Sequence, residues 1–475
     1  MHTTLTATQA TSVLLSELRK HCTTFAHWKG NNHLLESLEG KTDLEILVNE
    51  GSRDSFESVM HRLGYKKVQS QPWNVYPEVE DWIGFDYETG NLLHLHTHYA
   101  LVITLPYGRY IRLPWMQQFF KHITTDQQTG WPIPEPELET LILLLRLWAK
   151  GCTKPLNQPQ VFLEKKEELV ELLKKVEVDK FILICSELQL KAPEGIALKI
   201  REIIENQNLD DIRNLAKFYF EQLSDSIIKN SIYTSFRSVF FKYHLKSFDK
   251  LTLFAGPIKR KKTFQKQGKV IALVGSDGSG KSTLSNDLIK WLTFKIDTHY
   301  FYMGKVPFIK SYDRRLLSKL YLFVGSNIVS RLTRKLIGDF YHVIIIKHKV
   351  DMLRLARELS EKGSVIICDR FPQKEVQGIN DGPKCSHSKI NWATKAELRF
   401  FQEVQQIGAD VIFRLQVLPA VAFERKPEHS FALIKKKCES LDSLNFNNST
   451  IINIDANKPY DQVLLNLKRE IWAIL

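Results

Sequence analysis

The second half of the chain alternates between short apolar runs and longer stretches with helical periodicity. The apolar runs predict buried strands, at residues 270–274, 298–305, 364–371, 410–417 and 450–456. The segments between them predict helices, over residues 313–362 and 394–407, from 418 and from 460. Strands separated by helices are typical of an α/β fold in which helices flank a parallel sheet.

The first half has a different pattern. It predicts a helix near residues 12–18, a strand at 44–48, a second strand at 92–98 and a turn with a short strand at 107–115. From 135 to about 250 the periodicity is helical, and residues 137–148 are apolar enough to predict a buried helix. We therefore expect an α+β domain over 1–134, a helical region over 135–250 that packs on it, a basic linker over 251–268, and an α/β domain over 269–475.

A glycine-rich segment follows the strand predicted at 270–274 and opens a helix. This strand, loop and helix context makes the G-x-x-x-x-G-K-[ST] pattern a phosphate-binding P-loop. We expect Lys281 to contact the β- and γ-phosphates of ATP, and the Ser282 hydroxyl to ligate Mg²⁺. The predicted nucleotide-binding residues are Gly275, Ser276, Asp277, Gly278, Ser279, Gly280, Lys281, Ser282 and Thr283.

An acidic residue ends the strand predicted at 364–371. Asp369 is followed by Arg370, and the carboxyl ends of parallel strands meet at one edge of a sheet. Asp369 is therefore expected beside the P-loop, where it would help to hold Mg²⁺. Arg370 has a planar guanidinium that suits the phosphate of a small-molecule acceptor better than a hydroxyl.

Four landmarks of the second half resemble thymidylate-kinase-type P-loop kinases. They are the P-loop, Asp369-Arg370, the passage from Asp410 to Arg425, and Ile454-Asp455-Ala456. The resemblance implies a catalytic role for Lys281, Asp369, Arg370 and Arg425, with Arg425 in a lid over the transferred phosphoryl group. It also implies that Asp455 and Ala456 lie near adenine. Because residues 303–307 replace the nucleotide-holding segment of that family, the expected acceptor is a nucleotide or a sugar phosphate rather than dTMP in particular.

Two acidic residues mark the strand predicted at 44–48. Asp43 and Glu45 alternate, so both project from one face and could hold Mg²⁺. Together with the Gly30-Asn31 turn they resemble the nucleotidyltransferase superfamily, although Asn replaces its Ser and Glu its second Asp. The whole chain thus resembles a bacterial two-part type, a nucleotidyltransferase-like domain fused to a thymidylate-kinase-like domain, familiar from surface-polysaccharide gene clusters.

Three histidines share one face of the strand predicted at 92–98. His94, His96 and His98 occur with the period of two that a strand requires. Imidazoles at this spacing can ligate a transition metal, line an anionic-substrate pocket, or simply occupy a half-exposed sheet face. The sequence leaves these three interpretations open.

Charge and cysteine content indicate which partners and which compartment to expect. The net charge of +13 favours anionic partners, but the basic residues are scattered, so we expect no nucleic-acid partner. Six widely spaced cysteines without a CxxC, no apolar span and no signal-peptide pattern predict a cytoplasmic protein. The sequence leaves a homodimer open, as well as two other functions: a bifunctional kinase and nucleotidyltransferase, or a nucleotide-binding regulatory protein.

Overall fold

The computed structural model describes residues 7–70, 75–105, 109–151, 160–228, 261–304, 328–377, 380–384, 391–446 and 448–475. The chain divides into two compact units, residues 1–260 and 261–475, and each is treated by itself. The helix predicted at 231–246, the linker residues 251–260 and residues 313–327 of the long predicted helix lie outside the described residues. Among the helices that the structure describes, none is long and apolar enough to cross a membrane.

The N-terminal unit begins with a mixed sheet in the order β1-β2-β5-β4-β3. Strands β2 and β5 are parallel, and their register places Glu45 opposite His96. Apolar side chains from one sheet face and the adjacent helices form a core that includes Leu14, Phe56 and Trp82. The elements are α1 (Gln9–Lys20), β1 (Phe25–His27), α2 (Leu34–Leu38), β2 (Leu44–Val48), α3 (Arg53–Arg62), β3 (Lys66–Gln69), β4 (Val79–Phe85) and β5 (Leu92–His98).

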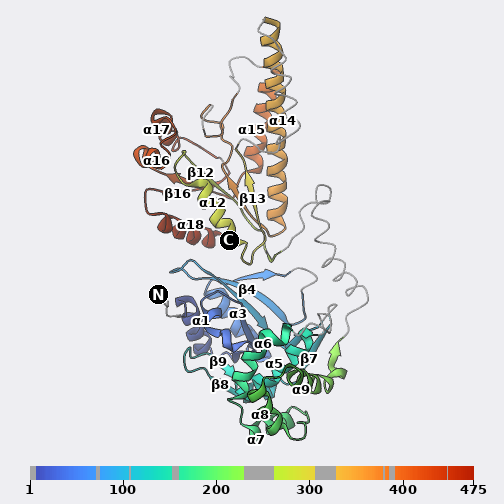
Figure 1. The fold of residues 1–475 in the computed structure, drawn as a ribbon. Coiled ribbons are helices and arrows are strands. Elements are labelled where there is room, and N and C mark those ends of the chain that lie inside the picture. Colours follow the sequence, from blue (N-terminus) through green and yellow to red (C-terminus); the bar gives the residue numbers. More distant parts are fainter. Residues whose placement is uncertain are drawn as a thin grey trace. The chain divides into compact units, whose positions relative to one another are not determined.

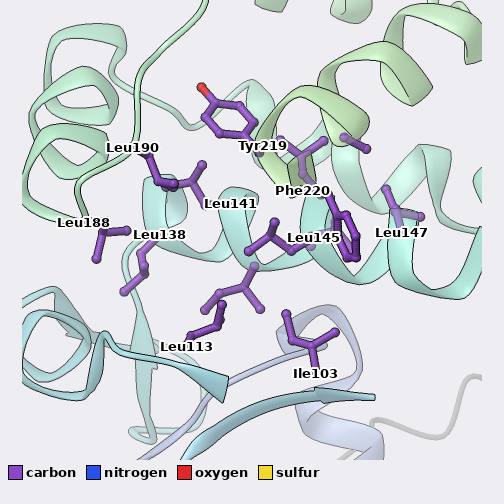
Figure 2. Packing of buried hydrophobic residues seen from close by; sticks show 14 of the residues in the cluster. Ile103, Leu113, Leu138, Leu141, Leu145, Leu147, Leu188, Leu190, Tyr219 and Phe220 are labelled. Carbon is purple, nitrogen blue, oxygen red and sulfur yellow. The ribbon is translucent and has the colours of Figure 1, made fainter. Parts of the chain in front are cut away.

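A second core joins the helical region to the sheet strands. Leucines of the long helix α5 pack against strand residues such as Ile103 and Leu113 and against Tyr219 and Phe220 (Figure 2). Because this helix is apolar around most of its circumference, neighbours cover it on several sides. The elements are β6 (Leu101–Thr104), β7 (Tyr110–Leu113), α4 (Met116–Lys121), β8 (Ile123–Thr125), β9 (Pro132–Pro134), α5 (Pro136–Gly151), α6 (Gln160–Leu173), α7 (Val178–Glu187), α8 (Ile196–Asn206) and α9 (Leu209–Glu221).

The prediction of helix throughout 135–250 is wrong at its described end. After α9, the β-branched pair Ile227–Ile228 forms a short strand, β10, that pairs with β7. The main-chain groups of β7 provide hydrogen-bond partners that local helical periodicity does not reveal. Likewise, the linker predicted over 251–268 contains a two-residue strand, β11 (Thr263–Phe264).

The C-terminal unit confirms the predicted α/β fold. The five strands of its central sheet are parallel and lie in the order β13-β14-β12-β15-β16. Helices α14 and α15 run side by side (Figure 1). The elements are β12 (Val270–Gly275), α12 (Lys281–Leu292), β13 (Thr298–Tyr302), α14 (Ile328–Glu361), β14 (Val365–Asp369), α15 (Trp392–Ile407), β15 (Val411–Gln416), α16 (Pro419–Arg425), α17 (Phe431–Glu439), β16 (Thr450–Asp455) and α18 (Tyr460–Ile474).

The order of the strands positions the site. Strand β12 lies centrally between β14 and β15, so the chain leaves it in a crevice where the sheet order reverses. Ligands of open α/β sheets bind at such a point, outside the carboxyl ends of the strands. The P-loop follows β12, and Asp369 is the last residue of β14, so both lie at this edge of the sheet.

Candidate active site

The loop between β12 and α12 has the backbone that a P-loop needs. Gly278 and Gly280 have φ values of 81° and 87°, in the left-handed region that favours glycine. A Cβ atom on Gly278 would come within 2.2 Å of the Ala422 carbonyl oxygen. Glycine at 278 is therefore required both by the turn and by the close approach of α16.

Lysine 281 lies inside this loop. Its Nζ donates to the Ser276 carbonyl oxygen at 2.5 Å, and Ser279 Oγ donates to the same oxygen at 2.9 Å. Gly280 gives α12 no side-chain cap, so the first turn of the helix keeps amide donors for an anion. Burial, and after it the nearby charge of Arg370, lower the pKa of Lys281 to about 8. A bound anion would relieve this unfavourable environment.

Asp369 lies where the sequence predicts it. Ser282 Oγ donates to its Oδ2 atom at 2.7 Å, and the Tyr300 hydroxyl donates to the same atom at 3.0 Å. The residue is fully buried, and its Oδ1 atom has no hydrogen-bond partner in the described parts of the chain. A buried carboxylate oxygen that is left over beside a hydroxyl suits a hard cation with oxygen ligands, so these residues fit Mg²⁺.

Helix α17 reaches the P-loop, and the sequence analysis missed this helix. Lys437 Nζ lies 2.5 Å from Asp277 Oδ2, and Cys438 Sγ lies 3.2 Å from Ser276 Oγ. The basic run Lys435-Lys436-Lys437 was the signal that the sequence offered. Its contact partner lies 160 residues earlier, and sequence spacing alone does not reveal a contact of that range.

A cavity of 430 Å³ opens beside the loop. Asp277, Lys437 and Arg370 line the part that adjoins the P-loop and Asp369. The apolar residues of its walls are Ile345, Ile346, Phe400 and Phe401. The polar and charged residues of its walls include His342, Lys349, Lys384 and Glu397. This volume is in the range of small-molecule sites, and the cations at one part suit an anionic group.

Arg370 is held in an unusual conformation toward this cavity. Its φ of 74° is left-handed, which is uncommon for a residue with a side chain. The guanidinium forms an ion pair with Asp381 at 3.5 Å and lies 5.9 Å from the centre of the Tyr302 ring. Its Nε atom is buried and has no hydrogen-bond partner among the described residues. The side chain therefore retains a donor that a phosphate can use.

The three other predicted residues lie together. Arg425 Nη1 donates to the Ala456 carbonyl oxygen at 2.9 Å, next to Asp455. Asp455 Oδ1 accepts from the Asn457 amide at 3.0 Å. The structure thus groups Arg425 with the segment predicted to lie near adenine. Its expected position over the transferred phosphoryl group stays a prediction.

Asp43, the first of the two carboxylates predicted to bind Mg²⁺, contacts a histidine. Asp43 Oδ1 lies 2.8 Å from His94 Nδ1, and Asp81 Oδ1 lies 2.9 Å from Nε2 of the same ring. Burial alone would lower the pKa of His94, but these two carboxylates raise it. Asp43 therefore faces an imidazole whose charged form its carboxylate favours.

Glu45 is surrounded by nitrogen atoms. Its Oε2 atom lies 3.1 Å from Lys29 Nζ, 3.0 Å from His96 Nδ1 and 3.1 Å from His98 Nε2. Burial acts to raise the pKa of Glu45, but Lys29 and the two histidines bring it well below its usual range. Both predicted carboxylates thus contact nitrogen atoms, Asp43 that of His94 and Glu45 those of Lys29, His96 and His98. The Mg²⁺ role of Asp43 and Glu45 stays a prediction that this arrangement does not favour.

Comparison with protein families finds no match to this chain. The chain is similar to the uncharacterized ATP-binding proteins YghR and YghS of Escherichia coli strain K12. The identity is 29% in both, over 43% of this chain and 87% of YghR, and over 44% of this chain and 94% of YghS. More than half of the chain therefore lies outside these likenesses. A deoxyadenosine kinase from M. mycoides is 16% identical, with a TM-score of 0.27, over 43% of this chain and 99% of the kinase.

Proposed function

We propose that the C-terminal unit is an ATP- and Mg²⁺-dependent phosphotransferase. The observation that carries this proposal is the combination of the P-loop with buried Asp369, whose Oδ2 atom accepts from Ser282 and whose Oδ1 atom has no partner among the residues that the structure describes. The likeness to two ATP-binding proteins supports nucleotide binding by a chain of this kind. A switch protein can share a P-loop, but the adjoining cavity favours a second substrate.

Different residues bind the phosphates of ATP, the Mg²⁺ ion and the adenine. The loop amides and the first turn of α12 hold the phosphates of ATP, and Lys281 exchanges the Ser276 carbonyl for a phosphate oxygen. Ser282 and Asp369 hold Mg²⁺, which when bound supplies positive charge beside the phosphates. Arg425, Asp455 and Ala456 border the adenine end. Phosphoryl transfer needs alignment and charge more than covalent chemistry from the protein, which these side chains can provide.

The acceptor we propose is a small molecule that carries a phosphate. A phosphate is largely a dianion at neutral pH, since its second pKa is about 6, and it needs no general base. Arg370 and Lys437 provide cations where the cavity adjoins the P-loop, and the walls offer Phe400 and Phe401 to the remainder of the molecule. A nucleotide or a sugar phosphate meets these conditions.

For the N-terminal unit we propose a nucleotidyltransferase-like module that lacks the usual pair of Mg²⁺-binding carboxylates. Its support is that imidazole or lysine nitrogens occupy both Asp43 and Glu45. A bifunctional enzyme would still transfer an α-phosphate group, and labelling with each of the four α-labelled nucleotides tests for it. Transfer that is lost in the Asp43→Ala, Glu45→Ala double variant would overturn this proposal.

The kinase proposal is tested by ADP release in the presence of candidate acceptors. A library of phosphorylated metabolites and of the same compounds without phosphate is offered with ATP and Mg²⁺. We expect phosphate-bearing compounds to stimulate ADP release, and no stimulation by the matched unphosphorylated compounds. ATP that binds without any acceptor-stimulated turnover would favour a regulatory role.

A further inference from the structure

A second ligand cluster lies in the N-terminal unit, remote in sequence from the P-loop. Glu45 on β2 faces His96 and His98 on the neighbouring parallel strand β5. One ligand atom from each residue lies within 4.8 Å of the others. Two of these separations are short, since Glu45 Oε2 is 3.0 Å from His96 Nδ1 and 3.1 Å from His98 Nε2.

The separations match those of ligands on one metal ion. Two atoms that are each about 2.1 Å from a metal lie about 3.0 Å apart in adjacent octahedral positions, and about 3.4 Å apart in a tetrahedron. The observed values of 3.0 and 3.1 Å lie close to the first figure. Two of the three ligand pairs, which are hydrogen-bonded in the structure, are therefore already at a separation that a shared metal ion allows.

The orientation of His98 also suits a ligand. The ring is 3% exposed and meets Trp28 edge to face at 5.0 Å. Its Nδ1 atom is buried with no hydrogen-bond partner in the described part of the chain, whereas Nε2 is directed at Glu45. The packing against Trp28 fixes the ring so that Nε2 points into the cluster.

We propose that Glu45, His96 and His98 bind a divalent first-row transition metal such as Zn²⁺ or Co²⁺. Two imidazoles and one carboxylate suit such ions, whereas Mg²⁺ prefers a set of oxygens. Three protein ligands leave at least one coordination position for water or for an oxygen of a substrate, as catalytic rather than structural metal sites do. This proposal does not rest on the phosphotransferase function of the other unit.

Lysine 29 is the residue that a metal must displace. Its Nζ lies 3.1 Å from Glu45 Oε2 and 3.5 Å from His98 Nε2, so it contacts two of the three ligand atoms. Its side chain also passes over the Trp28 ring, with Nζ 4.5 Å from the ring centre. A positive ammonium there competes with a metal ion for the same carboxylate. Removal of the ammonium should therefore strengthen metal binding.

The test is equilibrium dialysis of the untagged full-length protein against Zn²⁺, and separately Co²⁺, in millimolar Mg²⁺. Mg²⁺ fills carboxylate-only sites and competes poorly for imidazole. Because thiols elsewhere also bind these ions, each variant is compared with the parent. The variants are Glu45→Gln, His96→Gln and Lys29→Met, with His33→Gln as the control because His33 is a 47% exposed histidine of the same unit.

We expect the parent to hold one ion per chain that the Glu45→Gln and His96→Gln variants bind at least about a hundredfold more weakly. His33→Gln should match the parent. The Lys29→Met variant should bind more tightly than the parent, and the ion should raise the melting temperature of both. This third variant guards against loss of folding, since a damaged site does not gain affinity. Unchanged binding in Glu45→Gln and His96→Gln, or equal or weaker binding in Lys29→Met, overturns the proposal.

Discussion

Each of the two units places a strand carboxylate in different surroundings. In the C-terminal unit, Asp369 has hydroxyl neighbours and keeps one buried oxygen without a partner among the described residues. In the N-terminal unit, Oε2 of Glu45 contacts an ammonium and two imidazoles. A carboxylate thus suits a hard cation such as Mg²⁺ in one unit, whereas in the other it lies among nitrogen atoms. What surrounds an acid decides its role more than its place on a strand.

The largest expected effect comes from the P-loop lysine. Lys281→Ala removes the cation that bridges the leaving and the transferred phosphates, so turnover of ATP should fall by on the order of 10³. Lys290→Ala is the matched control, because Lys290 lies on the same helix with a side chain that is 78% exposed. Steady-state ADP release measures both. Full turnover by the alanine variant at 281 would contradict the phosphotransferase proposal.

Asp369→Asn tests the carboxylate side of the comparison. Asparagine keeps the shape but loses the charge, so the Mg²⁺ concentration needed for half-maximal turnover should rise by about 10²-fold. Asp43→Asn in the N-terminal unit should leave this value unchanged. A Mg²⁺ titration of turnover compares the two variants. Equal shifts in both would show that the units do not differ in the way described.

Arg370→Lys tests the proposed acceptor site. Lysine keeps the charge but loses the planar fork that matches phosphate oxygens, so the KM for a phosphate-bearing acceptor should rise by about tenfold or more. The KM for ATP should change little. Saturation kinetics with each substrate separate the two effects. An unchanged acceptor KM would mean that the cavity recognises another group.

The affinity for ATP should depend on pH through Lys281. In the empty protein its pKa is about 8, so the side chain loses its charge above this pH, while bound ATP favours the charged form. Binding then requires proton uptake, and affinity should fall by up to about tenfold per pH unit above pH 8. Titrations between pH 7.5 and 9.5 measure this slope. Lys281→Arg, which stays charged, should give a flat profile; a flat profile for the parent would contradict the prediction.

The smallest expected effect on ATP turnover is that of the Asp43→Ala, Glu45→Ala double variant. Neither residue lies in the unit that holds the P-loop, so turnover should stay within about twofold of the parent. The N-terminal unit itself should lose stability, since the largely buried Lys29 loses its acidic partner and His94 loses one of its two. Thermal unfolding followed beside turnover checks both statements. A large loss of turnover with intact folding would show that the two units act together.

The sequence was most informative where function depends on contiguous residues. The P-loop could be predicted because its glycines, lysine and hydroxyls follow one another between a strand and a helix. Asp369 could also be placed, 87 residues after Ser282, because parallel strands bring their carboxyl ends to one edge. In both cases a general rule of α/β sheets replaces knowledge of the particular contacts.

The remaining features depend on contacts that no local pattern encodes. The face shared by His94, His96 and His98 was predictable, but the pairing of two of them with Glu45 depends on the register between β2 and β5. The contact of Lys437 with Asp277 depends on where α17 packs. Such contacts follow from tertiary packing, which also turned Ile227–Ile228 into a strand where helix was expected.

Following a radioactive label from ATP tests the proposed phosphotransferase activity in a single experiment. The parent and the Lys281→Ala variant are incubated with Mg²⁺ and phosphorylated metabolites, once with γ-labelled and once with α-labelled ATP, and the products are separated by thin-layer chromatography. We expect the γ-label to pass to a small phosphate-bearing acceptor in the parent alone, and the α-label to stay in ATP and ADP. Transfer of the α-label only, or γ-transfer that survives in the alanine variant, would contradict the proposal.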